Sequence, residues 1–159
     1  MTAKPITPTL SVSEQLLPEE MAALAGAGFK SIICNRPDGE GADQPSFAEI
    51  KAAAKEAGLK AAYLPIVSGK VGDADAVAFG AAMDNLPKPI LAYCRTGTRS
   101  ATLWSLSEGG RGRPLPEIIT ATKAAGYDTS PDPRGWPGED CVVHPNQSRW
   151  HDGNGRNRV

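Results

Sequence analysis

The sequence predicts an α/β domain in which a mainly parallel central sheet is flanked by helices. Helical and strand patterns alternate along the chain, and the expected strands are short apolar runs of the kind that is buried on both faces of a parallel sheet. The 159 residues suffice for one domain with a core, and contents of 40% hydrophobic and 22% charged residues are typical of a globular chain.

The expected elements follow one another with loop residues between them. Ser46, with Glu49 three positions later, forms a capping box that opens one helix, and Pro18 followed by two glutamates opens another. Asp73 or its neighbour is expected to cap a third helix. We expect helices at residues 18–26, 46–58, 73–85, 99–107 and 116–125, and strands at residues 29–34, 61–67 and 89–94.

The character of the chain changes after about Tyr127. Prolines and glycines recur and the end is polar, which indicates an extended tail, either packed on the domain or mobile. We therefore divide the chain into a domain that carries the candidate site, residues 1–130, and a Pro/Gly-rich C-terminal tail, residues 131–159. Truncation beyond Pro133 is expected to leave the fold largely intact.

Charge and composition exclude several classes of function. The formal net charge is −1, so neither a nucleic acid nor a membrane partner is expected. No apolar run is long enough to cross a bilayer, and residues 1–5 lead into proline and threonine where a signal peptide would be apolar. Three cysteines do not form a disulfide framework, so the expected compartment is the reducing cytoplasm. There is no nucleotide fingerprint and no metal-ligand spacing, His144 and His151 included, so no cofactor and no metal are expected.

The strongest functional signal is the segment from Cys94 to Arg99, CRTGTR. A strand ends at the cysteine and a helix begins about five residues later, so backbone N–H groups converge on an anion near the helix N-terminus. A thiolate is stabilised there over the thiol, and we expect a nucleophile whose pKa lies well below the free value of about 8.5. The alternative is a buried structural cysteine followed by a solvated turn. The expected catalytic residues are Cys94 and Arg99, and the expected anion-binding residues are Arg95, Thr96, Gly97, Thr98, Ser100 and Arg36.

Ser100 and Arg36 are assigned to the site by their positions relative to the expected elements. Ser100 is expected to cap the helix or to stabilise the sulfur through its hydroxyl. Arg36 follows the strand that ends at Cys34, so it should lie at the same edge of the sheet as the nucleophile, with Asp38 or Glu40 orienting it or Arg99. The alternative is an ion-paired surface turn.

Cys34 also has two interpretations. Because it stands at a strand end, as the nucleophile does, it is a candidate resolving thiol. A cysteine packed in the core is the favoured alternative.

The segment from Tyr93 to Ala101 resembles the active loop of rhodanese-type sulfurtransferases, which carry sulfane sulfur as a persulfide on the matching cysteine. Residues 6–13, 25–38 and 62–66 are similar to a different group, a bacterial family with a dual-specificity-phosphatase-like scaffold. Its domain occurs alone or fused to beta-lactamase-like sulfur dioxygenases. This second resemblance covers about residues 4–130 and implies a cysteine-phosphatase-like three-layer fold.

Three features favour sulfur transfer over phosphate hydrolysis within these resemblances. Four residues separate Cys94 from Arg99, where the phosphatases have five. Tyr93 stands where those phosphatases have histidine, and Ser68 stands where their general acid is expected. Asp73 and Asp75 lie further along and are expected to cap a helix. Persulfide chemistry needs no general acid, because sulfite or a thiol leaves without protonation of an alkoxide.

The sequence therefore predicts a cysteine-dependent sulfurtransferase that carries sulfur as a Cys94 persulfide from thiosulfate or a persulfide donor to a thiol acceptor. The alternative is a phosphatase that acts through a Cys94 phosphocysteine. A non-enzymatic anion-binding module is the third interpretation. The expected partner is a small anionic substrate, namely thiosulfate, a persulfide or a phosphate ester, with a sulfur dioxygenase or a thiol as a further partner.

Overall fold

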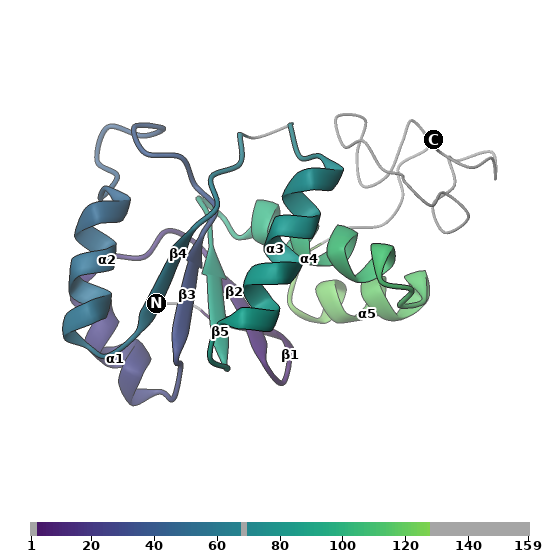
Figure 1. Ribbon diagram of the computed structural model, residues 1–159, viewed down its shortest axis with the longest axis horizontal. Helices are drawn as coiled ribbons and strands as arrows, with labels where there is room; N and C mark the ends of the chain where they lie inside the picture. The colour runs from purple at the N-terminus through teal and green to yellow at the C-terminus, as the bar shows by residue number, and fades with distance from the viewer. Residues whose placement is uncertain (1–2, 68–69, 128–159) are drawn as a thin grey trace.

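A mostly parallel five-stranded sheet forms the centre of the molecule in the computed structural model, which describes residues 3–67 and 70–127 (Figure 1). The strands run in the order β1-β2-β5-β3-β4, and β1 alone is antiparallel to its neighbour. Their bounds are β1 Lys4–Thr7, β2 Leu10–Ser13, β3 Ser31–Cys34, β4 Lys60–Tyr63 and β5 Ile90–Tyr93.

Helices cover both faces of the sheet, which gives the three layers expected of a cysteine-phosphatase-like domain. In Figure 1, α1 and α2 lie on one side of the sheet, and α3, α4 and α5 lie on the other. The 3-10 helix η1 precedes α1. The bounds are η1 Pro18–Glu20, α1 Met21–Gly26, α2 Phe47–Glu56, α3 Asp73–Asn85, α4 Thr98–Gly110 and α5 Leu115–Ala124.

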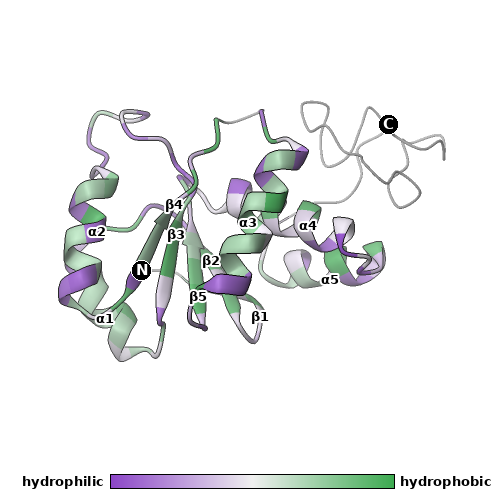
Figure 2. Ribbon diagram, viewed as in Figure 1, coloured by the Kyte–Doolittle hydropathy of each residue, from purple (hydrophilic) through white to green (hydrophobic). Residues whose placement is uncertain are grey.

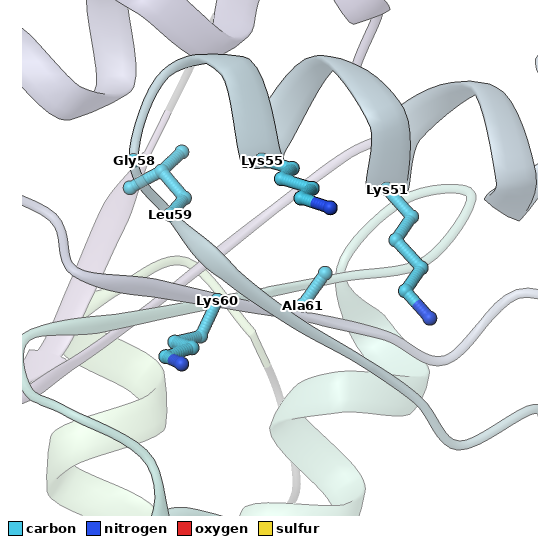
Figure 3. Close-up of a pocket in the computed structure, with 6 residues that line it drawn as sticks. All are labelled: Lys51, Lys55, Gly58, Leu59, Lys60 and Ala61. Carbon is cyan, nitrogen blue, oxygen red and sulfur yellow. The ribbon is translucent and has the colours of Figure 1, made fainter.

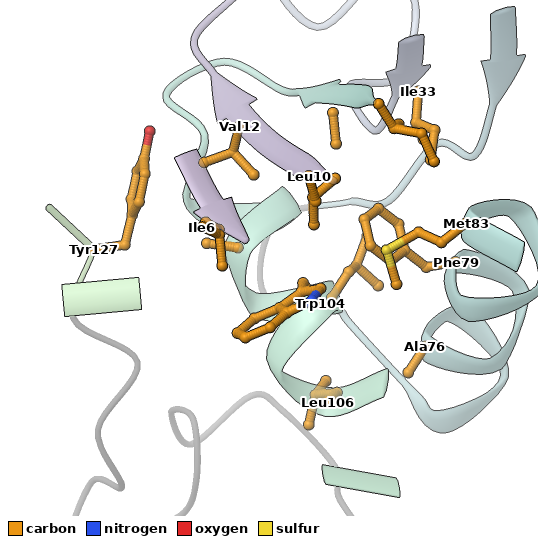
Figure 4. Close-up of a cluster of buried hydrophobic side chains, with 14 of the residues drawn as sticks. Ile6, Leu10, Val12, Ile33, Ala76, Phe79, Met83, Trp104, Leu106 and Tyr127 are labelled. Atoms are coloured by element: carbon orange, nitrogen blue, oxygen red, sulfur yellow. The ribbon is translucent and has the colours of Figure 1, made fainter. Parts of the chain in front are cut away.

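The core is divided between the two faces of the sheet, because alternate residues of the central strand β5 point to opposite faces. Ile90 and Ala92 belong to the cluster on the side of α3 and α4, which also contains Phe79 and Trp104 (Figure 4). Leu91 belongs to the second cluster, on the side of α1 and α2. The strands are accordingly hydrophobic along most of their length, as Figure 2 shows.

The capping box at the start of α2 is confirmed. The Ser46 hydroxyl accepts the N–H of Glu49 at 3.2 Å, and the Glu49 carboxylate accepts the N–H of Ser46 at 3.2 Å. At the start of α3 the cap is the residue next to Asp73, one of the positions expected for it. Gly72 is the N-cap residue, and its N–H donates to the carboxylate of Asp75 at 2.9 Å, whereas Asp73 is the first residue of the helix.

Several element bounds differ from the sequence expectation. β4 ends at Tyr63, short of the expected strand end, and Pro65 follows two residues later. α4 continues to Gly110, past the expected helix end at residue 107, and packs against α3. Strands β1 and β2 were not expected from the sequence, since each has four residues and prolines stand at positions 5 and 8.

The parallel strands bring several loops to one edge of the sheet. Tyr93, the last residue of β5, is paired with Ser13 of β2 and with Cys34 of β3. The chain that follows each of these strands therefore emerges at the same edge, where parallel sheets commonly bind their ligands. The expected tail and Ser68 lie outside the described residues. No helix among the residues described here is long and apolar enough to span a membrane.

Candidate active site

Cys94 lies directly after β5, at the base of a tight loop that leads into α4. The N–H of Gly97 donates a hydrogen bond to the Cys94 sulfur over 3.0 Å. Gly97 has a φ of +97°, in the left-handed region that favours glycine, and it is the N-cap residue of α4. Cys94 itself is fully buried. The sulfur therefore lies at the N-terminal end of a helix and accepts a backbone N–H there, as the sequence predicts for the nucleophile loop.

Arg99 lies in the first turn of α4 and is held from two directions. Its Nη1 donates to Oε2 of Glu40 and to the carbonyl of Ile66, each at 2.8 Å, and its Nη2 donates to Oε1 of Glu40 at 2.7 Å. The pKa of Arg99 is raised, chiefly by the hydrogen bonds to Glu40, with smaller contributions from the neighbouring Cys94. The guanidinium is thus fixed beside the sulfur.

Glu40 joins the two arginines that the sequence assigns to the site. Its Oε1 also accepts a hydrogen bond from Nε of Arg36 at 2.9 Å, and Arg36 donates through Nη1 to Oε1 of Gln15 at 3.0 Å. The pKa of the Glu40 carboxyl is lowered, first by the hydrogen bonds from Arg99 and further by Arg36, although burial opposes the shift. One carboxylate therefore orients both guanidinium groups, as the sequence proposes for Asp38 or Glu40.

A depression of about 510 Å³ opens beside this arrangement. The residues that line it are Arg36, Glu40, Gly41, Arg95 and Arg99. Three guanidinium groups and one carboxylate leave a net positive charge, which suits a small anionic ligand. Arg95 is exposed, so its guanidinium is accessible to a ligand that enters the depression.

Asp38 does not contact either arginine through any hydrogen bond seen among the described residues. Its Oδ1 accepts the N–H of Phe47, the first residue of α2, at 2.7 Å, and its own N–H donates to the hydroxyl of Tyr63 at 2.9 Å. Asp38 thus tethers the loop to the start of α2, because a carboxylate there satisfies an unpaired helical N–H. Of the two candidates, Glu40 is the one that orients the arginines.

Ser100 takes neither of the roles expected for it. It is the third residue of α4, so it does not cap the helix, and its hydroxyl donates to Oδ1 of Asn35 at 2.8 Å. Since the Asn35 amide nitrogen donates to the Leu64 carbonyl at 3.0 Å, its oxygen must accept, and the single proton of Ser100 is committed there. The hydroxyl proton is therefore not available to the sulfur.

The loop threonines contact each other and leave their side chains at the surface. The hydroxyl of Thr96 donates to that of Thr98 at 3.1 Å, and both residues are exposed.

Cys34 is a free cysteine in the core cluster beside α1 and α2, and its thiol donates to the carbonyl of Arg36 at 3.3 Å. Burial raises the pKa of Cys34. This arrangement matches the core-cysteine interpretation.

Four residues near the site have no role in the sequence prediction. Gln15 follows β2, a strand that the sequence pattern does not indicate, so its position at this edge of the sheet could not be predicted. Asn35 directly follows an expected strand, and its position alone pointed to the edge. The hydroxyl of Tyr127 donates to the carbonyl of Thr96 at 3.0 Å, and the backbone carbonyl of Ile66 accepts from Arg99. No sequence pattern indicates either contact.

A second depression, of about 460 Å³, lies where α2 is followed by β4 (Figure 3). It is lined by Lys51, Lys55, Gly58, Leu59, Lys60 and Ala61. Lys60 begins β4, whereas the candidate site is built at the opposite ends of the parallel strands. This depression therefore belongs to a different edge of the sheet from Cys94.

The fold and the cysteine loop define a cysteine-phosphatase-like domain. Residues 3–111 match the family described as the phosphatase-like domain of beta-lactamase hydrolase-like protein, and the chain belongs to that family. A curated relative, the beta-lactamase hydrolase-like protein of Agrobacterium fabrum, is 37% identical over 129 residues, which cover 80% of this chain and 30% of that protein. The chain thus spans about a third of the length of the curated relatives it matches.

Solved structures agree with this assignment. A protein of Neisseria meningitidis described as a candidate phosphatase is 36% identical, with a TM-score of 0.75 over 82% of this chain and 92% of that one. Pseudomonas aeruginosa TpbA, solved in complex with phosphotyrosine, shares the fold at 17% identity, with a TM-score of 0.56 over 79% of this chain and 74% of its own. These descriptions favour the phosphatase alternative over the sulfur transfer that the loop sequence predicts.

Proposed function

We propose that this chain is a cysteine-dependent phosphatase that hydrolyses a small phosphate monoester through a Cys94 phosphocysteine. The observation that carries the proposal is the position of the Cys94 sulfur. It accepts the N–H of Gly97 at 3.0 Å and lies beside the fixed guanidinium of Arg99. The family and the Neisseria relative support phosphate chemistry. The positive depression beside the loop suits the anionic substrate.

In this mechanism the Cys94 thiolate attacks phosphorus, and the bond from phosphorus to the ester oxygen breaks. The ester oxygen leaves with the electron pair and takes a proton from a general acid, and water then hydrolyses the phosphocysteine to release phosphate and the thiolate. Backbone N–H groups of the loop and Arg99 stabilise the equatorial oxygens, on which negative charge accumulates.

Asp73 is the general acid we propose for the first step. It begins α3, at the edge of the sheet where the loops of the site lie (Figure 1), and burial raises its pKa. A raised pKa keeps a carboxyl protonated closer to neutral pH, as a general acid requires. Asp75 belongs to the helix cap, because its carboxylate accepts the N–H of Gly72.

Sulfur transfer is the second candidate, and the spacing of the loop favours it. Four residues between Cys94 and Arg99 form a shorter ring than in the phosphatases that the scaffold resembles. In this reaction the thiolate attacks the outer sulfur of thiosulfate, the sulfur–sulfur bond breaks, and sulfite leaves with the electron pair. An acceptor thiolate then attacks the outer sulfur of the Cys94 persulfide and restores the Cys94 thiolate.

One preparation tests both reactions. Phosphatase activity predicts turnover of phosphotyrosine and of p-nitrophenyl phosphate, both abolished in Cys94→Ser. Sulfur transfer predicts that thiosulfate adds the mass of one sulfur atom to the wild type, that cyanide removes it, and that neither phosphate ester turns over.

Paired aspartate variants sharpen the test. Asp73→Asn should lose about 10²-fold in turnover of phosphotyrosine, whose leaving oxygen needs a proton, and much less with p-nitrophenyl phosphate, whose leaving group is stable as an anion. Asp75→Asn is the matched control and should keep turnover of both esters. Equal losses in the two variants would contradict the role of Asp73, and a persulfide without ester hydrolysis would overturn the phosphatase proposal.

A further inference from the structure

Tyr127 contacts the nucleophile loop from outside it. Its hydroxyl donates to the carbonyl of Thr96 at 3.0 Å, across 31 positions of sequence. Tyr127 follows α5 and lies beyond residues 3–111, which match the family. A residue from the C-terminal part of the described chain therefore reaches the loop that holds Cys94.

The bonded carbonyl belongs to the peptide unit whose other end contacts the sulfur. Within the Thr96–Gly97 peptide, the C=O accepts the Tyr127 proton, and the N–H donates to the Cys94 sulfur at 3.0 Å. The C=O and the N–H of a trans peptide lie in one plane and point in opposite directions. Fixing the carbonyl therefore fixes the direction of the N–H, and bonds in series polarise one another.

The side chain of Tyr127 is itself held in place. It is buried at the edge of the core cluster, and in Figure 4 its hydroxyl points away from that cluster. Its ring lies under the ammonium group of Lys4, 5.1 Å from the ring centroid. The hydroxyl also lies against Gly97, where a Cβ atom would overlap it. Burial raises the pKa of Tyr127, as do the nearby charges of Cys94 and Glu14, so the phenol keeps its proton and remains a donor.

We infer that Tyr127 is a positioning residue that holds the Thr96–Gly97 peptide so that its N–H stays directed at the Cys94 thiolate. The inference rests on the proposed function only in taking Cys94 as the nucleophile, and it applies equally to a phosphocysteine and to a persulfide. The charged and titratable groups that face the sulfur or Tyr127 are Arg99, Cys34, Glu14 and Lys4. None of them is altered when the hydroxyl of Tyr127 is removed.

The test is the pH dependence of Cys94 alkylation by iodoacetamide, with the modified site assigned by mass spectrometry against Cys34 and Cys141. Tyr127→Phe keeps the ring and should move the midpoint of the profile up by about 0.5–1 pH unit, which slows alkylation about three- to tenfold on the acid side. Tyr63→Phe is the matched control, since it removes a hydroxyl bonded to the N–H of Asp38, and it should leave the midpoint unchanged.

A second variant reverses the expected sign. With 3-fluorotyrosine at position 127 the phenol is a stronger donor, so the midpoint should move down. An unchanged midpoint in Tyr127→Phe, an equal shift in Tyr63→Phe, or an upward shift with fluorotyrosine would overturn the inference. If the shifts appear but neither phosphate ester nor thiosulfate reacts, the proposed function fails while the positioning role of Tyr127 stands.

Discussion

Glu40 and Arg99, 59 positions apart, form a two-pronged ion pair in which each carboxylate oxygen accepts a hydrogen bond from a different terminal nitrogen of the guanidinium. The carboxylate also accepts from Arg36, so one acid residue links the loop after β3 to the first turn of α4. A planar fork paired in this way has one orientation. The position of the cation beside Cys94 is therefore set by a residue that lies outside the nucleophile loop.

We predict that Glu40→Gln destabilises the fold and weakens anion binding. An amide cannot accept from both arginines with a full charge, and two partly buried guanidinium groups lose their counterion. The expected loss is roughly 1–2 kcal/mol, about 3–8 °C in Tm. Protection of Cys94 from alkylation by phosphate or sulfate should also weaken, because Arg99 is no longer held in one orientation.

The matched control for this change is Asp84→Asn. Asp84 forms a bidentate ion pair with Arg111 as Glu40 does with Arg99, but this pair lies at the surface. Its shortest contact, between Oδ2 of Asp84 and Nη2 of Arg111, is 2.7 Å. Solvent screens such a pair, so Tm and anion protection should change little. A loss in Asp84→Asn as large as that in Glu40→Gln would mean that the Glu40 pair has no special role.

The same pair predicts how stability depends on pH. The pKa of Glu40 is lower in the folded protein than in the unfolded chain, chiefly because Arg99 bonds to it. On acidification the unfolded chain takes up the proton first, so the stabilisation is complete at neutral pH and is lost as the pH falls below about 4.3. The Tm difference between wild type and Glu40→Gln should be constant from pH 6 to pH 8. It should shrink once the pH falls below about 4.3. A difference that grows on acidification would have the wrong sign for this explanation.

Ser100→Ala should destabilise the protein without changing the nucleophile directly. It removes the buried donor that satisfies Oδ1 of Asn35, a residue that is fully buried between the ends of β3 and β4. An unsatisfied buried carbonyl costs about 1–3 kcal/mol. Thermal unfolding measures the loss, and Thr120→Ala is the control, because it removes an exposed hydroxyl that bonds within its own helix. If alkylation of Cys94 slowed strongly while Tm stayed the same, the hydroxyl would act on the sulfur after all.

Local signals in the sequence predicted most of the fold. The capping box at Ser46, the glycine after the nucleophile and the short apolar runs each depend on near neighbours, so the pattern indicates them directly. β1 and β2 exist because β2 pairs with β5, about 80 residues further along, and a four-residue strand carries too little pattern to predict that pairing. The sulfur-transfer prediction rested on the length of the loop, on Tyr93 and on Ser68, whereas the scaffold relatives favour the phosphatase alternative.

The sequence predicted which residues form the candidate site better than it predicted the hydrogen bonds between them. Cys94 and Arg99 follow from the loop itself, and Glu40 from its place after a strand. Only the folded structure separates Glu40 from Asp38, because the turn between them points one carboxylate at the arginines and the other at α2. Tyr127 contacts the loop through a single hydroxyl from a distant segment, and no periodicity marks such a residue.

Two separate effects oppose a side chain at position 97. Its φ of +97° is unfavourable for any residue with a Cβ, and that Cβ would overlap the hydroxyl of Tyr127. Gly28 has a similar φ of +102° with nothing within 4 Å, so Gly28→Ala isolates the backbone effect. That control should cost about 1–2 kcal/mol by thermal unfolding and leave Cys94 alkylation unchanged.

Gly97→Ala should cost more and should also raise the midpoint pH of alkylation, because the peptide that donates to the sulfur is displaced. Adding Tyr127→Ala to Gly97→Ala removes the collision but not the strain, so the alkylation profile should stay shifted, since the hydroxyl that holds the Thr96 carbonyl is also gone. A Gly97→Ala protein that matches Gly28→Ala in both stability and alkylation would show that Tyr127 does not press against the loop.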